Sequence, residues 1–130
     1  MATKLLHIDR TETSPQIDMD LEQGTLEFVG RSLPANSEQF YSRVYRWLDE
    51  YLRAPREETT VNMKLDYLDT SSSKHLYNIF NRLSAVNERG QRVHVNWHFE
   101  TGDEEMAETG KDYQRFFGLD FQFIEVEELF

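Results

Sequence analysis

The chain contains no cysteine among its 130 residues. This absence excludes a disulfide framework, a thiolate metal site and a cysteine nucleophile. Long apolar runs are also missing, since no stretch approaches the roughly 18 apolar residues of a membrane-spanning helix. The N-terminal pair Leu5-Leu6 is too short for the apolar region of a signal peptide. We therefore expect a soluble, cytoplasmic protein with no direct membrane insertion.

Basic residues are in the minority, 14 against 24 acidic residues, which leaves a formal net charge of −10. A nucleic-acid-binding protein needs a basic patch that displaces the counterions of the phosphates, so this balance argues against a nucleic-acid partner. An anionic membrane surface is disfavoured for the same reason. The acidic charge is explained by solubility alone, or by steering toward basic protein partners.

Aromatic residues, in contrast, are plentiful: nine Phe, six Tyr and two Trp supply material for a hydrophobic core. Domains usually contain about 100–200 residues. We therefore predict a single domain over residues 1–130, of which residues 1–15 are polar and loosely ordered.

Two periodicities alternate along the chain. Apolar residues recur at every second position in 16–22, 25–30, 59–68, 91–100 and 121–127, which is typical of half-buried strands. Between these segments, helical spacing predicts three helices: one capped by Asn36 or Ser37, one after residues 70–73, and one opened by a capping box over 101–104 and carrying Met106, Tyr113, Phe116 and Phe117. The order β-β-α-β-α-β-α-β predicts an α/β fold, with a mostly parallel five-stranded sheet and helices mainly on one face.

Four hydroxyl side chains stand in a row at Thr70, Ser71, Ser72 and Ser73, where the third predicted strand turns into the second helix. Thr70 or Ser71 as an N-cap accounts for some of them. A phosphoryl group at this position would also benefit from the free amides and the dipole of the helix, and it would add a charge of about −1.5 to −2. From these residues alone, a cap and a modification site both remain open.

No other pattern indicates catalysis or a cofactor. His94 and His98 lie on one strand face but about 13 Å apart at about 3.3 Å per residue, too far to bind one ion. The acidic run from Glu100 to Glu108 lacks the spacing of a calcium loop. The glycines are scattered and form no phosphate-binding loop. We expect no catalytic residues, no metal and no cofactor, which favours a protein that is not an enzyme.

The stretches GTLEFVGRSLPANSEQFY, WLDEYLRAP, LDYLDTSSSKHL and VNWHFETGDEEMAETGKDY resemble the SiaC-type regulatory phosphoproteins, a STAS-like bacterial family. The resemblance extends from about residue 13 to residue 125. The element order, with a hydroxyl-rich turn between a strand and a helix, is also similar to the STAS domains of anti-sigma-factor antagonists. The resemblance implies a STAS-like fold and a role in partner switching.

In that family the threonine that opens the TSS motif is the phosphoacceptor, which implies Thr70 here, with Ser71 as the alternative. A cognate protein kinase adds the phosphate and a PP2C-type phosphatase removes it. The unphosphorylated protein binds and activates a diguanylate cyclase, which raises cyclic di-GMP and favours biofilm growth. Asp69 stands where the family more often has Asn. The expected partner-binding residues surround the acceptor, flanked by the loop over residues 31–37: Tyr67, Leu68, Asp69, Ser71, Ser72, Lys74 and His75.

Two other functions stay open at this level. The same switch could act on a different target, such as an anti-sigma factor. Alternatively, the polar face of the sheet could bind a small ligand or a metal through Lys64, Asp66, His94 and His98.

Overall fold

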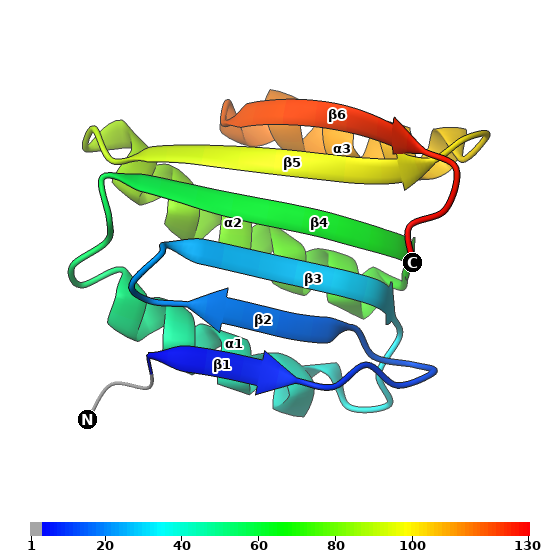
Figure 1. Cartoon of the computed structure of the whole chain (residues 1–130), viewed down its shortest axis with the longest axis horizontal. Coiled ribbons are helices and arrows are strands. Elements are labelled where there is room, and N and C mark those ends of the chain that lie inside the picture. The colour runs from blue at the N-terminus through cyan, green and yellow to red at the C-terminus, as the bar shows by residue number, and fades with distance from the viewer. Residues whose placement is uncertain (1–3) are drawn as a thin grey trace.

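A six-stranded sheet carries three helices in a computed structural model that describes residues 4–130 (Figure 1). The strands follow one another in the sheet in their sequence order. The elements are β1 (Leu5–Ile8), β2 (Gln16–Asp20), β3 (Thr25–Ser32), α1 (Ser37–Tyr51), β4 (Glu58–Leu68), α2 (Thr70–Glu88), β5 (Arg92–Glu100), α3 (Glu104–Phe117) and β6 (Asp120–Val126).

The sheet has an antiparallel half and a parallel half. β1, β2 and β3 pair antiparallel, whereas β3, β4, β5 and β6 pair parallel. One helix connects each parallel pair, which is the connection that parallel neighbours require. The predicted α/β fold is thus confirmed, although the sheet contains six strands rather than five.

The additional strand corrects the expectation that residues 1–15 are loosely ordered. β1 pairs with β2 from Leu5 opposite Asp20 to Ile8 opposite Ile17. The loop after β1 is also held, because the side chain of Thr11 accepts the backbone N–H of Ser14 at 3.0 Å. A four-residue strand is too short to show a clear alternation, so pairing with β2 decides its structure. The part of the prediction that concerns residues 1–3 lies outside the described residues.

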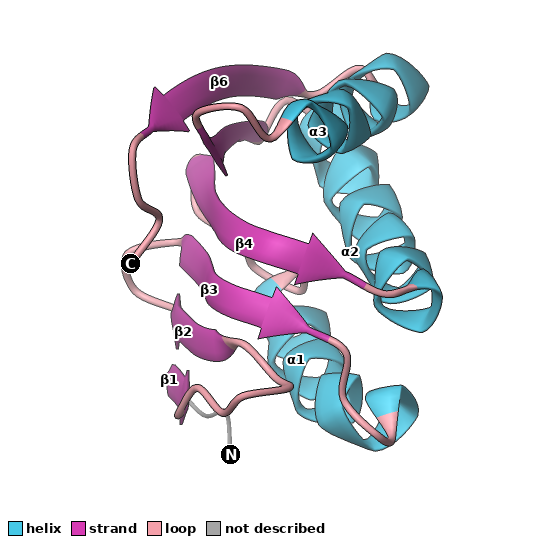
Figure 2. Ribbon diagram, turned by 90° about the vertical axis from the view of Figure 1, so that its right-hand side faces the viewer, coloured by secondary structure: helices cyan, strands magenta, loops and turns pink. Residues whose placement is uncertain are grey.

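All three helices cover the same face of the sheet (Figure 2). Burial alternates along each long strand, and the apolar side chains of that alternation form the core beneath the helices. The largest side chains with less than 2% exposure include Trp97, Tyr41, Tyr51, Phe28 and Phe80. The opposite face of the sheet carries polar side chains, as the alternation predicts.

Helix α3 packs closely on β5 because residue 110 is glycine. A Cβ atom at Gly110 would lie 2.7 Å from the ring of Trp97, whose Nε1 donates to the carbonyl of Met106 at 2.9 Å. Asp103, and not a capping box starting at Thr101, caps this helix by accepting the N–H of Met106 at 3.0 Å. Phe116, expected on the buried stripe of α3, is 67% exposed. No helix within residues 4–130 is long and apolar enough to cross a bilayer.

Candidate functional site: the turn from β4 into α2

The hydroxyl-rich segment lies at the carboxyl edge of the parallel strands, where β4 passes into α2. Asp69 has an extended backbone (φ −80°, ψ 174°), and its Oδ1 accepts the backbone N–H of Ser72 at 2.7 Å. Asp69 is therefore the N-cap, and the prediction that Thr70 or Ser71 has this role is wrong. The backbone N–H of Asp69 donates to the carbonyl of Ser32 at 2.9 Å, which ties the turn to the end of β3.

The four hydroxyls occupy four different environments. The Ser71 hydroxyl donates to the Asp69 carboxylate at 3.2 Å, and the Ser73 hydroxyl donates to the Asp69 carbonyl at 3.0 Å. Ser72 is fully buried. Thr70 is exposed, and its hydroxyl forms no hydrogen bond with any side chain or backbone group of residues 4–130. Of the four, Thr70 is the hydroxyl that a second protein can reach without breaking a contact.

A buried hydrogen-bond chain lies beneath Thr70 and joins β3, α1 and α2. Ser32 Oγ donates its single proton to Ser72 Oγ at 2.7 Å. In its second contact, with Tyr41 OH at 2.7 Å, Ser32 Oγ is therefore the acceptor and the tyrosine hydroxyl is the donor. All three residues have 0% exposure. Burial raises the pKa of Tyr41 to about 12, so the phenol stays protonated and keeps donating at neutral pH. We call Ser32, Tyr41 and Ser72 the buried hydroxyl chain.

His75, one turn into α2, extends this contact between the two helices. Its ring stacks on Tyr41 with centroids 4.8 Å apart, and its Nδ1 lies 2.7 Å from the hydroxyl of Tyr45. Burial lowers the pKa of His75, so the neutral imidazole is favoured and its Nδ1 can accept the Tyr45 proton. The first turns of α2 are thus packed firmly on α1.

The structure brings the predicted partner-binding residues together around Thr70. Tyr67 is 50% exposed at the end of β4, and Lys74 is exposed one turn beyond Thr70 on the same side of α2. Ser72 is an exception, because its burial conflicts with a direct partner contact and it supports the turn from inside. The remaining members are partly buried at the rim of the turn: Leu68, Asp69, Ser71 and His75.

The flanking segment starts later than the predicted loop over residues 31–37. Arg31 and Ser32 belong to β3, where Arg31 lies beside Tyr67 of β4. The connection to α1 is therefore residues 33–36, and in it Leu33 is 36% exposed. This short connection borders the turn through Ser32, whose carbonyl accepts from Asp69.

Three residues that support the site, Ser32, Tyr41 and Tyr45, did not stand out in the sequence. Ser32 continues the inward alternation of β3 four positions after Phe28, which is a signal for burial. Tyr41 is seven positions before Leu48 on the buried stripe of α1, which is the same kind of signal. Nothing in the sequence pairs these hydroxyls with Ser72 or His75, because their contacts join segments up to 40 residues apart.

Each polar side chain proposed for a ligand or metal site already contacts another group of the protein. His94 lies between Asp120 at 2.7 Å and Glu58 at 3.1 Å, and Lys64 pairs with Glu27 at 3.4 Å. In the same way, Asp66 accepts from Arg31 at 3.0 Å and His98 contacts the carbonyl of Met63 at 3.3 Å. Within residues 4–130, no group of three or more His, Asp or Glu side chains is arranged to hold a metal ion.

Comparison with known proteins adds a family and solved structures. The profile described as "SiaC family regulatory phosphoprotein" matches residues 8–126. An uncharacterized Pseudomonas aeruginosa protein, PA14_02130 of strain UCBPP-PA14, is 30% identical over 109 residues, which are 84% of this chain and 86% of that protein.

Solved structures agree with this match. The structure of SiaC of Pseudomonas aeruginosa has a TM-score of 0.86 and 27% identity, covering 95% of this chain and 100% of that one. A chain in the crystal structure of the diguanylate cyclase SiaD in complex with its activator SiaC, from the same organism, has a TM-score of 0.87 and 29% identity. That match covers 93% of this chain and 99% of the other.

Proposed function

Because this chain belongs to the SiaC family of regulatory phosphoproteins, we propose that it is a non-enzymatic adaptor controlled by phosphorylation of Thr70. In the proposal, its unphosphorylated form binds and activates a diguanylate cyclase. The observation that carries the proposal is the state of the four hydroxyls, since only that of Thr70 is both exposed and free of hydrogen bonds within the described chain. The relative that was solved with the cyclase SiaD, as its activator, supports the choice of partner.

A phosphate on Thr70 Oγ1 would sit at the start of α2. The helix dipole favours an anion there, and the ammonium of Lys74 lies one turn further along the same side of the helix. The Asp69 carboxylate opposes the new charge, because it immediately precedes the acceptor and remains bound to the Ser72 amide. The phosphorylated turn therefore holds two adjacent negative groups, and this is the local change that a partner would detect.

The switch also needs a rigid support, so that a charge at one residue changes binding and does not merely disturb the loop. The buried hydroxyl chain and the stack of His75 on Tyr41 provide this support. In the proposal, a cognate protein kinase transfers the terminal phosphoryl group of ATP to Thr70 Oγ1. A PP2C-type phosphatase then hydrolyses the phosphothreonine, which restores the hydroxyl and releases inorganic phosphate.

The test compares cyclase binding and activation by the wild-type protein, Thr70→Ala and Thr70→Glu. We expect the wild type and Thr70→Ala to bind and activate the cyclase, and Thr70→Glu to do neither. Ser71→Ala is the matched control, because it removes the neighbouring hydroxyl and leaves the acceptor in place. Equal binding by all four proteins would refute the switch.

Phosphorylation is checked separately by intact-mass and peptide mass spectrometry after incubation with the kinase. One phosphate on Thr70, absent from Thr70→Ala and retained in Ser71→Ala, is expected. A phosphate on Ser71 in the wild-type protein would move the acceptor by one residue. Capture of an anti-sigma factor in place of the cyclase would keep the switch but change its target.

A further inference from the structure

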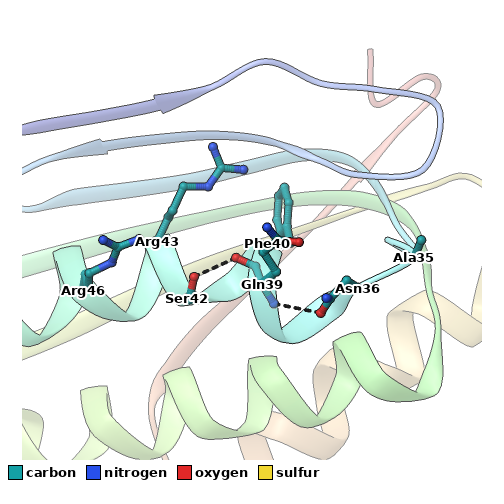
Figure 3. A pocket seen from close by; sticks show the side chains of 7 residues that line it. All are labelled: Ala35, Asn36, Gln39, Phe40, Ser42, Arg43 and Arg46. Carbon is teal, nitrogen blue, oxygen red and sulfur yellow. Dashed lines mark hydrogen bonds between the residues drawn. The ribbon is translucent and has the colours of Figure 1, made fainter.

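A pocket of about 620 Å³ lies along the first half of α1, formed by residues other than those of the Thr70 turn. Its wall consists of the connection before α1 and the outer side of the helix, from Ala35 to Arg46 (Figure 3). Two arginines, Arg43 and Arg46, extend from the same side of the helix, and Phe40 lies next to Arg43. The pocket therefore combines two cations with the edge of an apolar core residue.

These two cations have no counterion among residues 4–130. Several other arginines pair with carboxylates; for example, Arg53 contacts Glu50 at 3.4 Å and Arg82 contacts Asp49 at 2.9 Å. Arg43 and Arg46 are exposed and form no ion pair with any residue from 4 to 130, although acidic residues outnumber basic ones in the chain. An unneutralised arginine pair on an acidic protein is a local surface to which carboxylates are attracted.

The neighbouring side chains leave the arginines available. The guanidinium of Arg43 lies 5.7 Å from the centroid of the Phe40 ring, a contact that holds the side chain over an aromatic face without using its hydrogen-bond donors. Asn36 is engaged in the cap of α1, where it accepts the N–H of Gln39 at 3.1 Å. The donors of both arginines thus face solvent.

We propose that this pocket is the docking site for a short acidic segment of the partner protein. In this arrangement, carboxylates of the segment pair with Arg43 and Arg46, and an apolar side chain packs against Phe40. The inference rests on the proposed function for the identity of the partner, and it adds the chemistry of the segment that the partner contributes. Guanidinium groups suit this role because they bind carboxylates in a planar, two-point geometry.

Two observations favour a protein segment over other anions. All the lining residues come from residues 35–46, so a small anion would touch one wall only, whereas small-molecule sites enclose most of their ligand. A protein segment supplies the second wall itself. An extended polyanion such as RNA would reach beyond the two arginines and be repelled by the rest of the protein, whose net charge is −10. A short acidic segment would contact the arginines without extending that far.

The pocket lies on the same helix as the buried hydroxyl chain. Phe40 of the pocket contacts Tyr41 of the chain edge to face, with centroids 5.0 Å apart. Tyr41 in turn contacts Ser32, which binds Ser72 in the first turn of α2. A partner held at this pocket and at the Thr70 turn would therefore contact two sides of one packed unit.

The first experiment needs no partner protein. A synthetic peptide of glutamates flanking one leucine is titrated into the isotope-labelled protein, and amide chemical shifts are followed by NMR. We expect shifts concentrated in residues 35–46, lost in Arg43→Glu/Arg46→Glu and retained in the charge-matched control Arg56→Glu/Arg89→Glu, whose arginines are exposed elsewhere. A peptide with glutamine in place of glutamate should cause no shifts. Absence of shifts at 35–46, or equal shifts with oligothymidylate, would overturn the inference.

The second experiment measures binding of the intact, unphosphorylated protein to the diguanylate cyclase at low and at physiological ionic strength. We expect Arg43→Glu/Arg46→Glu to weaken binding by about tenfold or more and to reduce its salt dependence, with the control within about twofold of wild type. Thermal unfolding verifies that both variants fold. If the two variants bound the cyclase with equal affinity, the pocket would not be part of the interface with the cyclase.

The two proposals can fail separately. If Thr70→Glu binds the cyclase as well as wild type while the arginine variant does not, the switch is wrong and the docking site stands. If the wild-type protein does not bind the cyclase, the proposed partner is wrong, and the peptide titration alone decides for or against the pocket.

Discussion

Substitution of Ser32 by alanine tests whether the buried hydroxyl chain holds the turn that carries Thr70. In the native protein, the Ser32 hydroxyl accepts from Tyr41 and donates to Ser72, each at 2.7 Å, in a region with 0% exposure at all three residues. Ser32→Ala removes the central member and leaves two buried hydroxyls without this partner. No water can replace it unless the core opens.

The expected loss follows from the energies of buried polar groups. A hydrogen bond contributes about 0.5–1.5 kcal/mol net, and a buried group left unsatisfied costs about 1–3 kcal/mol. Ser32→Ala removes two hydrogen bonds, and Tyr41 can rearrange partly toward Ser72. We therefore expect the free energy of unfolding to decrease by about 2 kcal/mol. Ser73→Ala, whose hydroxyl binds one backbone carbonyl at the partly buried rim of the turn, should cost at most about 0.5–1 kcal/mol.

Urea unfolding, followed by tryptophan fluorescence and by circular dichroism, measures these free energies if both probes give the same transition. The triple variant Ser32→Ala/Tyr41→Phe/Ser72→Ala has no unsatisfied hydroxyl and should recover part of the stability lost in Ser32→Ala. A loss for Ser32→Ala no larger than that for Ser73→Ala would refute the reasoning. The reasoning would also be refuted if the triple variant lost more stability than the sum of the losses measured for its three single substitutions.

Three further predictions concern other parts of the molecule. Hydrogen bonds to two carboxylates raise the pKa of His94, so protonated His94 stabilises the folded protein fully below the ordinary histidine pKa, and this stabilisation is lost as pH rises through the raised value. Between about pH 6 and pH 8 the melting temperature should therefore fall further for wild type than for His94→Gln. Parallel pH profiles of the two proteins would contradict this. Gly110→Ala places a Cβ 2.7 Å from the Trp97 ring and should cost about 1–3 kcal/mol in denaturant unfolding; an unchanged midpoint would show that α3 can shift freely on β5. Asp69→Asn keeps a cap of similar strength but removes the negative charge beside the acceptor. Because the phosphate dianion is then no longer repelled by that charge, the second pKa of a phosphate on Thr70, measured by 31P NMR, should be lower than in wild type. An identical pKa would show that Asp69 does not act on the phosphate.

The positions of the strands β2 to β6 and of the three helices could be predicted from periodicity, because alternation and helical spacing reflect which side chains must leave water. The position of β1 could not be predicted, because four residues are too few to show an alternation and its structure depends on pairing with β2. Ser72 lies four positions before Leu76 on the buried stripe of α2, but in a run of four hydroxyl residues this spacing alone does not decide which hydroxyl is buried. The cap was ambiguous, because Asp, Thr and Ser are all favoured at that position.

The sequence by itself determined that this is an α/β protein with one covered sheet face, a strongly acidic charge and a hydroxyl-rich turn at the start of a helix. Only the tertiary structure decided which hydroxyl of that turn is free. The bond from the Asp69 amide to Ser32 sets the cap one residue earlier than expected, and packing of α2 on α1 then turns Ser72 inward and Thr70 outward. These distinctions depend on contacts between residues distant in the sequence, which a local pattern does not contain.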